Sequence, residues 1–232
     1  TVRPQHVFDT RSPFAPWTVT PWPGVRSYFL AWGASGSAKF FFASNRRDRS
    51  TMDLYEADAA TRTIREVARS DGHVLAWFIG TDQRPAARLR QLGAQDGADS
   101  ALELLQPDGS WKHLRTIGGW DHLAVHRIDP AAGKAWGTSN VGRDKSALVE
   151  IDLASGQERV VAQHPVVDLR WVYYHRSAAR PIGYVVDDGL PAMHWVDEAF
   201  GTEVAQAVQR ARAQGLLEDA PRVVRPQSSS ED

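Results

Sequence analysis

The sequence contains no cysteine among its 232 residues. Without cysteine the chain can form no disulfide, no thiolate nucleophile and no zinc site with cysteine ligands. It also lacks an apolar run near the ~18 residues that a membrane-spanning helix needs, and its polar first residues do not resemble a signal sequence. We therefore expect a soluble chain without a membrane partner, while the compartment, cytoplasm or periplasm, stays open.

The chain also lacks an excess of charge of either sign. Lys and Arg total 27 and Asp and Glu total 28, which gives a formal net charge of -1. A domain that binds nucleic acid usually carries a clear basic excess, so no nucleic-acid partner is expected. Hydrophobic residues make up 42% of the chain, which is typical of a globular protein.

Signatures of catalysis and of cofactor binding are missing as well. A hydrolase nucleophile elbow needs Gly-x-Ser-x-Gly, and the nearest segments, residues 33–37 and 137–141, both lack the second glycine. Gly33 and Gly36 resemble part of a phosphate loop, but no Gly-Lys-Ser or Gly-Lys-Thr follows. The sequence predicts no catalytic residue, no nucleotide and no other cofactor in this chain.

Two histidines have the spacing of a helical zinc motif. His122 and His126 are four positions apart, but Leu123 stands where that motif needs its glutamate. The surrounding residues favour a strand, in which four residues span about 13 Å. Two imidazoles that far apart do not share one zinc ion with bonds of about 2.1 Å, so no metal site is predicted.

What the sequence does contain is an internal repeat of 46 to 48 residues. Leu54, Leu102 and Leu148 lie 48 and then 46 positions apart, within copies of one alternating pattern. Repeats of this length occur in helical solenoids and in β-propellers. The repeated segments are rich in aromatic and β-branched residues and alternate with a period of two, which favours antiparallel strands.

The repeat predicts an all-β fold, a partial β-propeller of about four blades with four antiparallel strands each, and one short C-terminal helix. Blades are expected near residues 25–69, 70–116, 119–164 and 165–200. Residues 1–24 contain five prolines, which suppress strand pairing and predict an extended lead-in with room for one edge strand. In residues 201–232, Thr202 is expected to cap a helix from Glu203 toward Gly215. One further strand over Arg222 to Arg225 and a frayed tail would follow.

Tryptophan and arginine supply the candidate contacts. Trp32, Trp77 and Trp171 recur near the repeat spacing, so we expect them to pack between blades rather than to stack on carbohydrate. Arg46 and Arg47 directly follow a predicted strand. They are candidates for contact with a peptide substrate in the central channel, where a guanidinium could bind a carboxylate, and solvated turn arginines are the alternative.

Several phrases of the sequence resemble the propeller repeats of bacterial prolyl oligopeptidase family serine peptidases. They are Phe-Ala-Ser-Asn-Arg-Arg-Asp at residues 42–48, Met-Asp-Leu-Tyr-Glu-Ala-Asp at 52–58 and Ser-Ala-Leu-Val-Glu-Ile-Asp-Leu-Ala-Ser-Gly at 146–156. Residues 164–168, 181–184 and 192–197 resemble the blade that precedes a helical segment in the dipeptidyl or acylaminoacyl peptidase branch. The resemblance covers about residues 25–215, and TolB-like propellers share its Ser-Asn-Arg and Leu-Tyr-x-x-Asp patterns.

In that family a propeller of seven or eight blades caps an α/β-hydrolase domain and filters access to its serine. The resemblance therefore implies a non-catalytic propeller portion, a fragment or a stand-alone relative, that gates and orients peptide substrates for a hydrolase domain outside this chain. Two alternatives remain: a TolB-like protein-interaction scaffold, and a small glycan-active propeller with clustered carboxylates. Four blades leave open edges, so the expected partners include missing blades, the hydrolase domain or a second copy of the chain.

Overall fold

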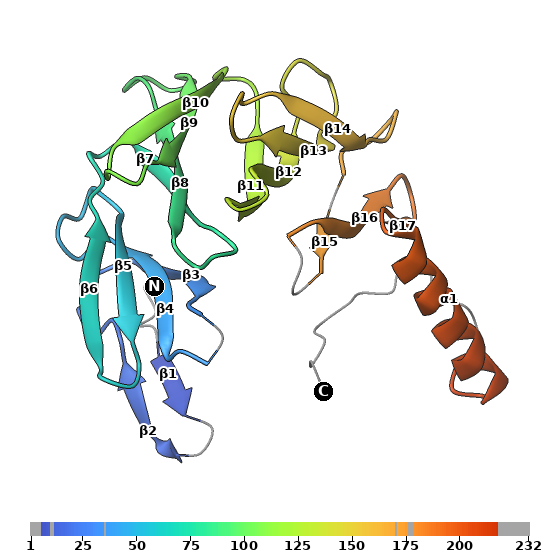
Figure 1. The fold of residues 1–232 in the computed structure, drawn as a ribbon, viewed down its shortest axis with the longest axis horizontal. Helices are drawn as coiled ribbons and strands as arrows, with labels where there is room; N and C mark the ends of the chain where they lie inside the picture. Colours follow the sequence, from blue (N-terminus) through green and yellow to red (C-terminus); the bar gives the residue numbers. More distant parts are fainter. Residues whose placement is uncertain (1–5, 10–11, 35, 170, 176–178, 218–232) are drawn as a thin grey trace. The chain divides into compact units, whose positions relative to one another are not determined.

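The computed structural model describes residues 6–9, 12–34, 36–169, 171–175 and 179–217 (Figure 1). The chain divides into two compact units, residues 1–120 and 121–232. Each unit consists mainly of antiparallel strands that pair with their neighbours in sequence. We describe the two units separately.

The first unit contains a two-stranded hairpin and two four-stranded sheets. The hairpin consists of β1 (His6–Asp9) and β2 (Ser12–Thr18). The first sheet consists of β3 (Ser27–Trp32), β4 (Lys39–Ser44), β5 (Asp53–Asp58) and β6 (Thr63–Ala68). The second consists of β7 (Val74–Ile79), β8 (Pro85–Gln91), β9 (Ser100–Leu105) and β10 (Trp111–Ile117).

The second unit contains one four-stranded sheet, one three-stranded sheet and a helix. The complete sheet consists of β11 (Leu123–Asp129), β12 (Lys134–Ser139), β13 (Ala147–Asp152) and β14 (Glu158–Ala162). The last sheet consists of β15 (Trp171–Tyr174), β16 (Pro181–Asp187) and β17 (Pro191–Trp195), and α1 (Glu198–Ala213) follows it.

These meandering sheets are the blades of a partial β-propeller, and the predicted fold class is confirmed. The last sheet has three described strands rather than the predicted four, because the chain leaves β17 and enters α1 at Glu198. The lead-in contains two strands where one edge strand was expected. Its hairpin tolerates Pro13 and Pro16 in β2, since a strand with one free edge need not donate every backbone N–H.

The helix begins five residues before the predicted start. Asp197, not Thr202, is the N-cap, with extended φ and ψ of -92° and 98° and a carboxylate that accepts a hydrogen bond from the Phe200 backbone N–H. Thr202 lies inside the helix and donates its hydroxyl to the Glu198 carbonyl at 2.9 Å. Gly201 is buried against the Trp195 ring. Any larger residue would collide with that ring, which explains why glycine stands here despite its poor helix propensity.

The strand predicted at Arg222 to Arg225 and the tail lie outside the described residues.

The core of the first unit lies on both faces of the β3–β6 sheet. On one face, Phe40, Phe42, Tyr55 and Ala57 pack with Val19 of the lead-in. On the other face, a cluster joins this sheet to the next one. Its buried members are Phe41, Ala43, Leu54 and Trp77. Contacts between neighbouring sheets therefore hold this unit together, as between propeller blades.

The three tryptophans of the repeat do not share one environment. Trp77 is 3% exposed, and its indole N–H donates to the Met52 carbonyl at 2.7 Å. Trp32 is 63% exposed and Trp171 is 42% exposed. The expectation that all three pack between blades is therefore wrong for Trp32 and Trp171, because both side chains are exposed whereas Trp77 is buried. Among the described residues, no helix combines the length and the apolar character needed to cross a membrane.

Candidate functional site

The candidate site lies in the turn between β4 and β5, where the sequence places three arginines within four residues. Arg46, Arg47 and Arg49 follow the buried strand end at Ser44 and Asn45. The turn is stabilised by Asp48, whose carboxylate accepts hydrogen bonds from the backbone N–H and the hydroxyl of Ser50. These two bonds lower the pKa of Asp48. The three arginines have different partners, so their chemical capacities differ.

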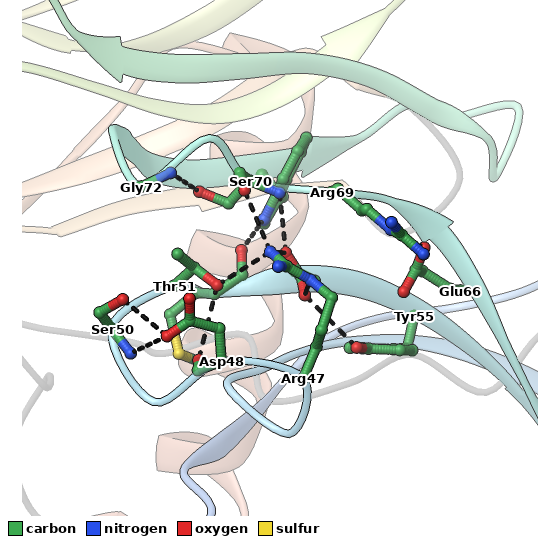
Figure 2. Close-up of polar contacts among 12 residues, drawn as sticks. Arg47, Asp48, Ser50, Thr51, Tyr55, Glu66, Arg69, Ser70 and Gly72 are labelled. Carbon is green, nitrogen blue, oxygen red and sulfur yellow. Dashed lines mark hydrogen bonds and ion pairs between the residues drawn. The ribbon is translucent and has the colours of Figure 1, made fainter.

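Arg47 binds the buried carboxylate of Asp53. Figure 2 shows the Arg47 side chain between Thr51 and Ser70, its other two partners. Its Nε and Nη2 atoms lie 2.7 and 2.9 Å from the two carboxylate oxygens. The same Nη2 group also donates to the hydroxyl of Thr51 at 3.1 Å and to the carbonyl of Ser70 at 3.2 Å. This bidentate geometry is the strong form of an arginine–carboxylate pair. Arg47 therefore connects the β4–β5 turn to Asp53 at the start of β5 and to Ser70, which follows β6.

Asp53 has no solvent contact and depends on these donors. Its side chain is 0% exposed and also accepts from the Ser70 backbone N–H at 2.8 Å and from the Tyr55 hydroxyl at 3.5 Å. Burial, followed by the negative charge of Asp53, raises the pKa of Tyr55 to about 12. The phenol therefore stays protonated at neutral pH and can donate. The bond to Asp53 in turn raises the pKa of Arg47.

Arg46 makes none of the hydrogen bonds of this network and lies against aromatic rings. Its guanidinium carbon is 4.0 Å from the centre of the Trp22 ring and 5.4 Å from that of Tyr55. The residue is exposed, and no hydrogen bond or ion pair is found for its side chain within the described part of the chain. Stacking orients the planar guanidinium and leaves its N–H edge available for a carboxylate or another planar anion.

Hydrogen bonds to the backbone hold the segment around Trp22, the residue whose ring lies against Arg46. The carbonyl of Trp22 accepts from the Val25 N–H at 3.3 Å, and the carbonyl of the following Pro23 accepts from Arg49 Nη2 at 3.1 Å. Three residues later, the Arg26 N–H donates to the Asn45 side chain. The lead-in is thus tied to the turn on both sides of Trp22.

The structure separates the two arginines that the sequence grouped together. Arg46 keeps an open binding edge, whereas the guanidinium of Arg47 is used by Asp53, Thr51 and Ser70. Sequence reasoning did not connect Trp22 with this turn. The only signal was the rigid Pro-Trp-Pro-Gly segment, which suggests a fixed turn but does not show what the ring contacts.

His126, one of the two histidines with zinc-motif spacing, contacts two hydroxyl groups. His126 lies at a bulge of β11, with Nδ1 3.1 Å from the Tyr174 hydroxyl and Nε2 3.5 Å from the Thr138 hydroxyl. Burial lowers the pKa of His126, and the charges of Arg127 and His122 lower it further. Within the described ranges, no three side chains of His, Cys, Asp or Glu gather as metal ligands would.

No family model matches the sequence, and no curated protein matches it either. Among solved structures, a puromycin hydrolase aligns with a TM-score of 0.55 and 16% identity, covering 84% of this chain and 34% of its own. TolB from Acinetobacter baumannii aligns at 0.49 and 13%, covering 79% and 44%. An oligogalacturonate lyase in complex with manganese aligns at 0.49 and 14%, covering 84% and 57%.

The likeness to the puromycin hydrolase, at a TM-score of 0.55, supports the propeller fold that the sheets show. At such low identity the three likenesses show nothing about the substrate of this chain. The chain spans less than two thirds of the length of each of these proteins. What a complete protein of this architecture does is therefore a matter for proposal.

Proposed function

We propose that the chain is the substrate-orienting propeller portion of a prolyl oligopeptidase-like serine peptidase, with hydrolysis carried out by a domain outside this sequence. One observation carries the proposal: the resembling phrases occupy equivalent places in different sheets. Residues 42–48 end β4 and enter the turn to β5, residues 52–58 include β5, and residues 146–156 include β13. Residues 192–197 end β17 directly before α1, in the order that the resemblance implies.

The fold supports this proposal at a coarser level. The puromycin hydrolase that aligns with 84% of this chain is about two and a half times as long, which fits a propeller accompanied by further domains. The present sequence contains no Gly-x-Ser-x-Gly elbow. In this proposal the chain therefore contributes binding and orientation, and no bond-breaking step.

Arg46 is the residue through which the propeller would orient a peptide. Its stacked guanidinium would bind the C-terminal carboxylate of a short peptide through two parallel N–H bonds. Because the guanidinium carbon already lies 4.0 Å from the centre of the Trp22 ring, we expect little side-chain entropy to be lost on binding. Peptides with an amidated C-terminus should therefore bind more weakly than those with a free carboxylate.

The experiment compares short peptides that carry a fluorescein on their N-terminus and end in a carboxylate or in an amide. We expect the purified chain to increase the anisotropy of the carboxylate forms, and Arg46→Gln to weaken that binding about tenfold, the loss of one charge-assisted interaction. Arg84→Gln, at an exposed arginine in another turn of the same unit, should leave binding unchanged. Cleavage of the peptides by the pure chain, or no saturable binding at millimolar concentration, would contradict the proposal.

A TolB-like interaction scaffold is the second candidate, because the same Ser-Asn-Arg and Leu-Tyr-x-x-Asp patterns occur there. Its supporting observation is an exposed aromatic surface on β3, where Phe29 and Trp32 contact each other with ring centres 5.1 Å apart. A folded protein partner with micromolar affinity, together with no effect of Arg46→Gln on any peptide, would favour this candidate. For a glycan-active propeller, the described part of the chain supplies no supporting observation.

A further inference from the structure

The β3–β6 sheet has one face that is only partly covered. On this face, which we call the first face, Phe29 and Trp32 of β3 stand beside Phe40 and Phe42 of β4. Phe40 and Phe42 are buried under the lead-in, but Phe29 is 42% exposed and Trp32 is 63% exposed. All four residues are aromatic, and the two exposed rings, Phe29 and Trp32, contact each other. Adjoining exposed rings of this kind often mark interaction surfaces.

The next sheet in the chain shows what normally covers such a face. Trp77 of β7 occupies the position in its sheet that Phe29 of β3 occupies in the first sheet. Across the strands, Phe29 is followed by Phe42 and Tyr55, and Trp77 by Arg88 and Glu103. Trp77 is nevertheless almost fully buried, because the β3–β6 sheet packs on it with Phe41, Ala43 and Leu54. A face of this kind therefore takes the apolar face of another blade.

The last sheet of the chain also has an apolar face, which corresponds to the side of the β3–β6 sheet that carries Ala43 and Leu54 and covers Trp77. In the last sheet, Trp171 of β15, Val185 of β16 and Met193 of β17 lie opposite one another and share a face. The reverse side of that sheet packs on the preceding sheet through Val186 and Leu148. The first turn of α1 contacts Trp195 on the face of Trp171. Val185, in the middle strand, is already buried within the chain, so the exposed part of this face is Trp171, at 42%, with the half-buried Met193. We call this surface the last face.

We propose that the first face of one copy of this chain binds the last face of a second copy, head to tail. The contact would repeat between copies the packing already present between β3–β6 and β7–β10. Inside the chain, the face of β3–β6 that carries Phe41, Ala43 and Leu54 covers Trp77. Between copies, the last face would take the place of that covering face, and the first face, with its exposed rings, would take the place of the face of Trp77. Neither Phe29 nor Trp32 has a charged residue opposite it in the sheet, so covering these two rings does not bury a charge paired with them.

A second copy is the occupant that the chain itself provides. Each copy carries one face of each kind, so the contact joins different surfaces of two identical molecules. Such heterologous contacts form closed rings when the rotation between copies permits closure, and open chains otherwise. Besides their lead-in hairpins, two copies would together contribute eight blades, which lies within the range of complete propellers.

The first experiment measures the mass of the purified chain by light scattering during size-exclusion chromatography, over a range of concentrations. We expect dimers or larger species that dissociate on dilution. Trp32→Arg should give a monomer whose circular dichroism and melting temperature match those of the parent, because Trp32 lies at the surface. Trp120→Arg is the matched control: Trp120 is 94% exposed and lies outside both faces, and this variant should associate like the parent.

Mixing two variants tests the head-to-tail arrangement directly. Trp171→Arg should also be monomeric, yet a mixture of Trp32→Arg and Trp171→Arg should form a one-to-one dimer, because each partner retains the face that the other has lost. A chain that is monomeric at all concentrations would overturn the proposal. Association that survives in Trp32→Arg, or in Trp171→Arg alone, would overturn it too. These results do not depend on peptide binding by Arg46, so the proposed function can fail independently.

Discussion

At the scale of single residues, the buried charge of Asp53 decides how the β4–β5 turn is held. A carboxylate without solvent contact is tolerated only where donors replace its lost hydration. Asp53 has such donors in Arg47, Ser70 and Tyr55. Its role is therefore structural, and a substitution should affect folding rather than peptide binding.

Asp53→Asn preserves the shape of the side chain but removes its charge. We expect this variant to lose about 2 kcal/mol of unfolding free energy, since charge-assisted bonds to Arg47 and Ser70 become neutral or are lost. Urea unfolding followed by tryptophan fluorescence measures the difference. Asp144→Asn is the control, because the Asp144 side chain is 88% exposed and its substitution should change stability by less than about 0.5 kcal/mol. Equal effects of the two substitutions would show that Asp53 does not hold the turn.

His126 gives the second unit a dependence on pH. Its pKa is lowered in the folded chain from the ordinary value of 6.5, so the unfolded chain takes up the proton first as the pH falls. Stability is therefore complete above about pH 6.5 and declines below it. A protonated imidazole has no lone pair left to accept a hydrogen bond from either the Tyr174 or the Thr138 hydroxyl, while Arg127 and His122 add positive charge nearby.

Melting temperatures between pH 7.5 and 5.0 test this linkage. His126→Gln keeps a hydrogen-bond acceptor but cannot titrate, so it should lose less stability than the parent over this range. His113→Gln changes a histidine of the first unit, outside the surroundings of His126, and should follow the parent curve. If His126→Gln loses as much stability as the parent, the pH dependence originates elsewhere.

At the scale of elements, the start of α1 shows which local signals the sequence carried. A threonine before Glu203 is a good capping pattern, and it predicted the wrong residue because an equally good cap, Asp197, precedes it. Choosing between them required knowledge of Trp195, which packs on Gly201 and extends the helix toward the sheet. Local propensity predicted a helix here, but tertiary contact determined its first residue.

Two substitutions distinguish these caps. Asp197→Ala should reduce helical circular dichroism at 222 nm and destabilise the helix by about 1 kcal/mol, because the Phe200 N–H loses its acceptor and Arg180 loses an ion-pair partner at 3.0 Å. Thr202→Ala should have little effect or a slightly favourable one, since alanine is the better helix former. The opposite order of effects would restore Thr202 as the cap.

The strand repeat was predictable because equivalent strands of successive blades bury similar apolar residues. Leu54, Leu102 and Leu148 are all fully buried, as residues repeated for packing should be. Asn45 and Asn140 accept hydrogen bonds from the Arg26 and His122 backbones in equivalent turns. Side-chain pairs were not predictable in this way, because Ala147 stands at the start of β13 where Asp53 stands at the start of β5.

At the scale of the whole molecule, the repeat predicted the number of sheets but could not show which sheet faces are covered. Coverage depends on what packs beside a blade, and the period of the sequence carries no information about that. Trp77 is buried and Trp32 is exposed, although both recur near the repeat spacing. The open edge of Arg46 was equally hidden, because it depends on the contact with Trp22 across more than twenty positions.

The division of the chain into two units after Trp120 predicts where a protease should first cut. Trp120 is 94% exposed and follows Gly118 and Gly119, and exposed segments with few buried contacts open at the lowest cost in free energy. Limited chymotrypsin digestion should therefore cleave after Trp120 before the buried Trp77 and Trp136 become accessible. It should yield two fragments that mass spectrometry assigns to residues 1–120 and 121–232. Trp120→Gln should suppress this cut and leave the melting temperature unchanged, because the side chain is at the surface. Early cleavage inside the sheets, or unchanged cleavage of Trp120→Gln, would show that the units do not separate at this residue.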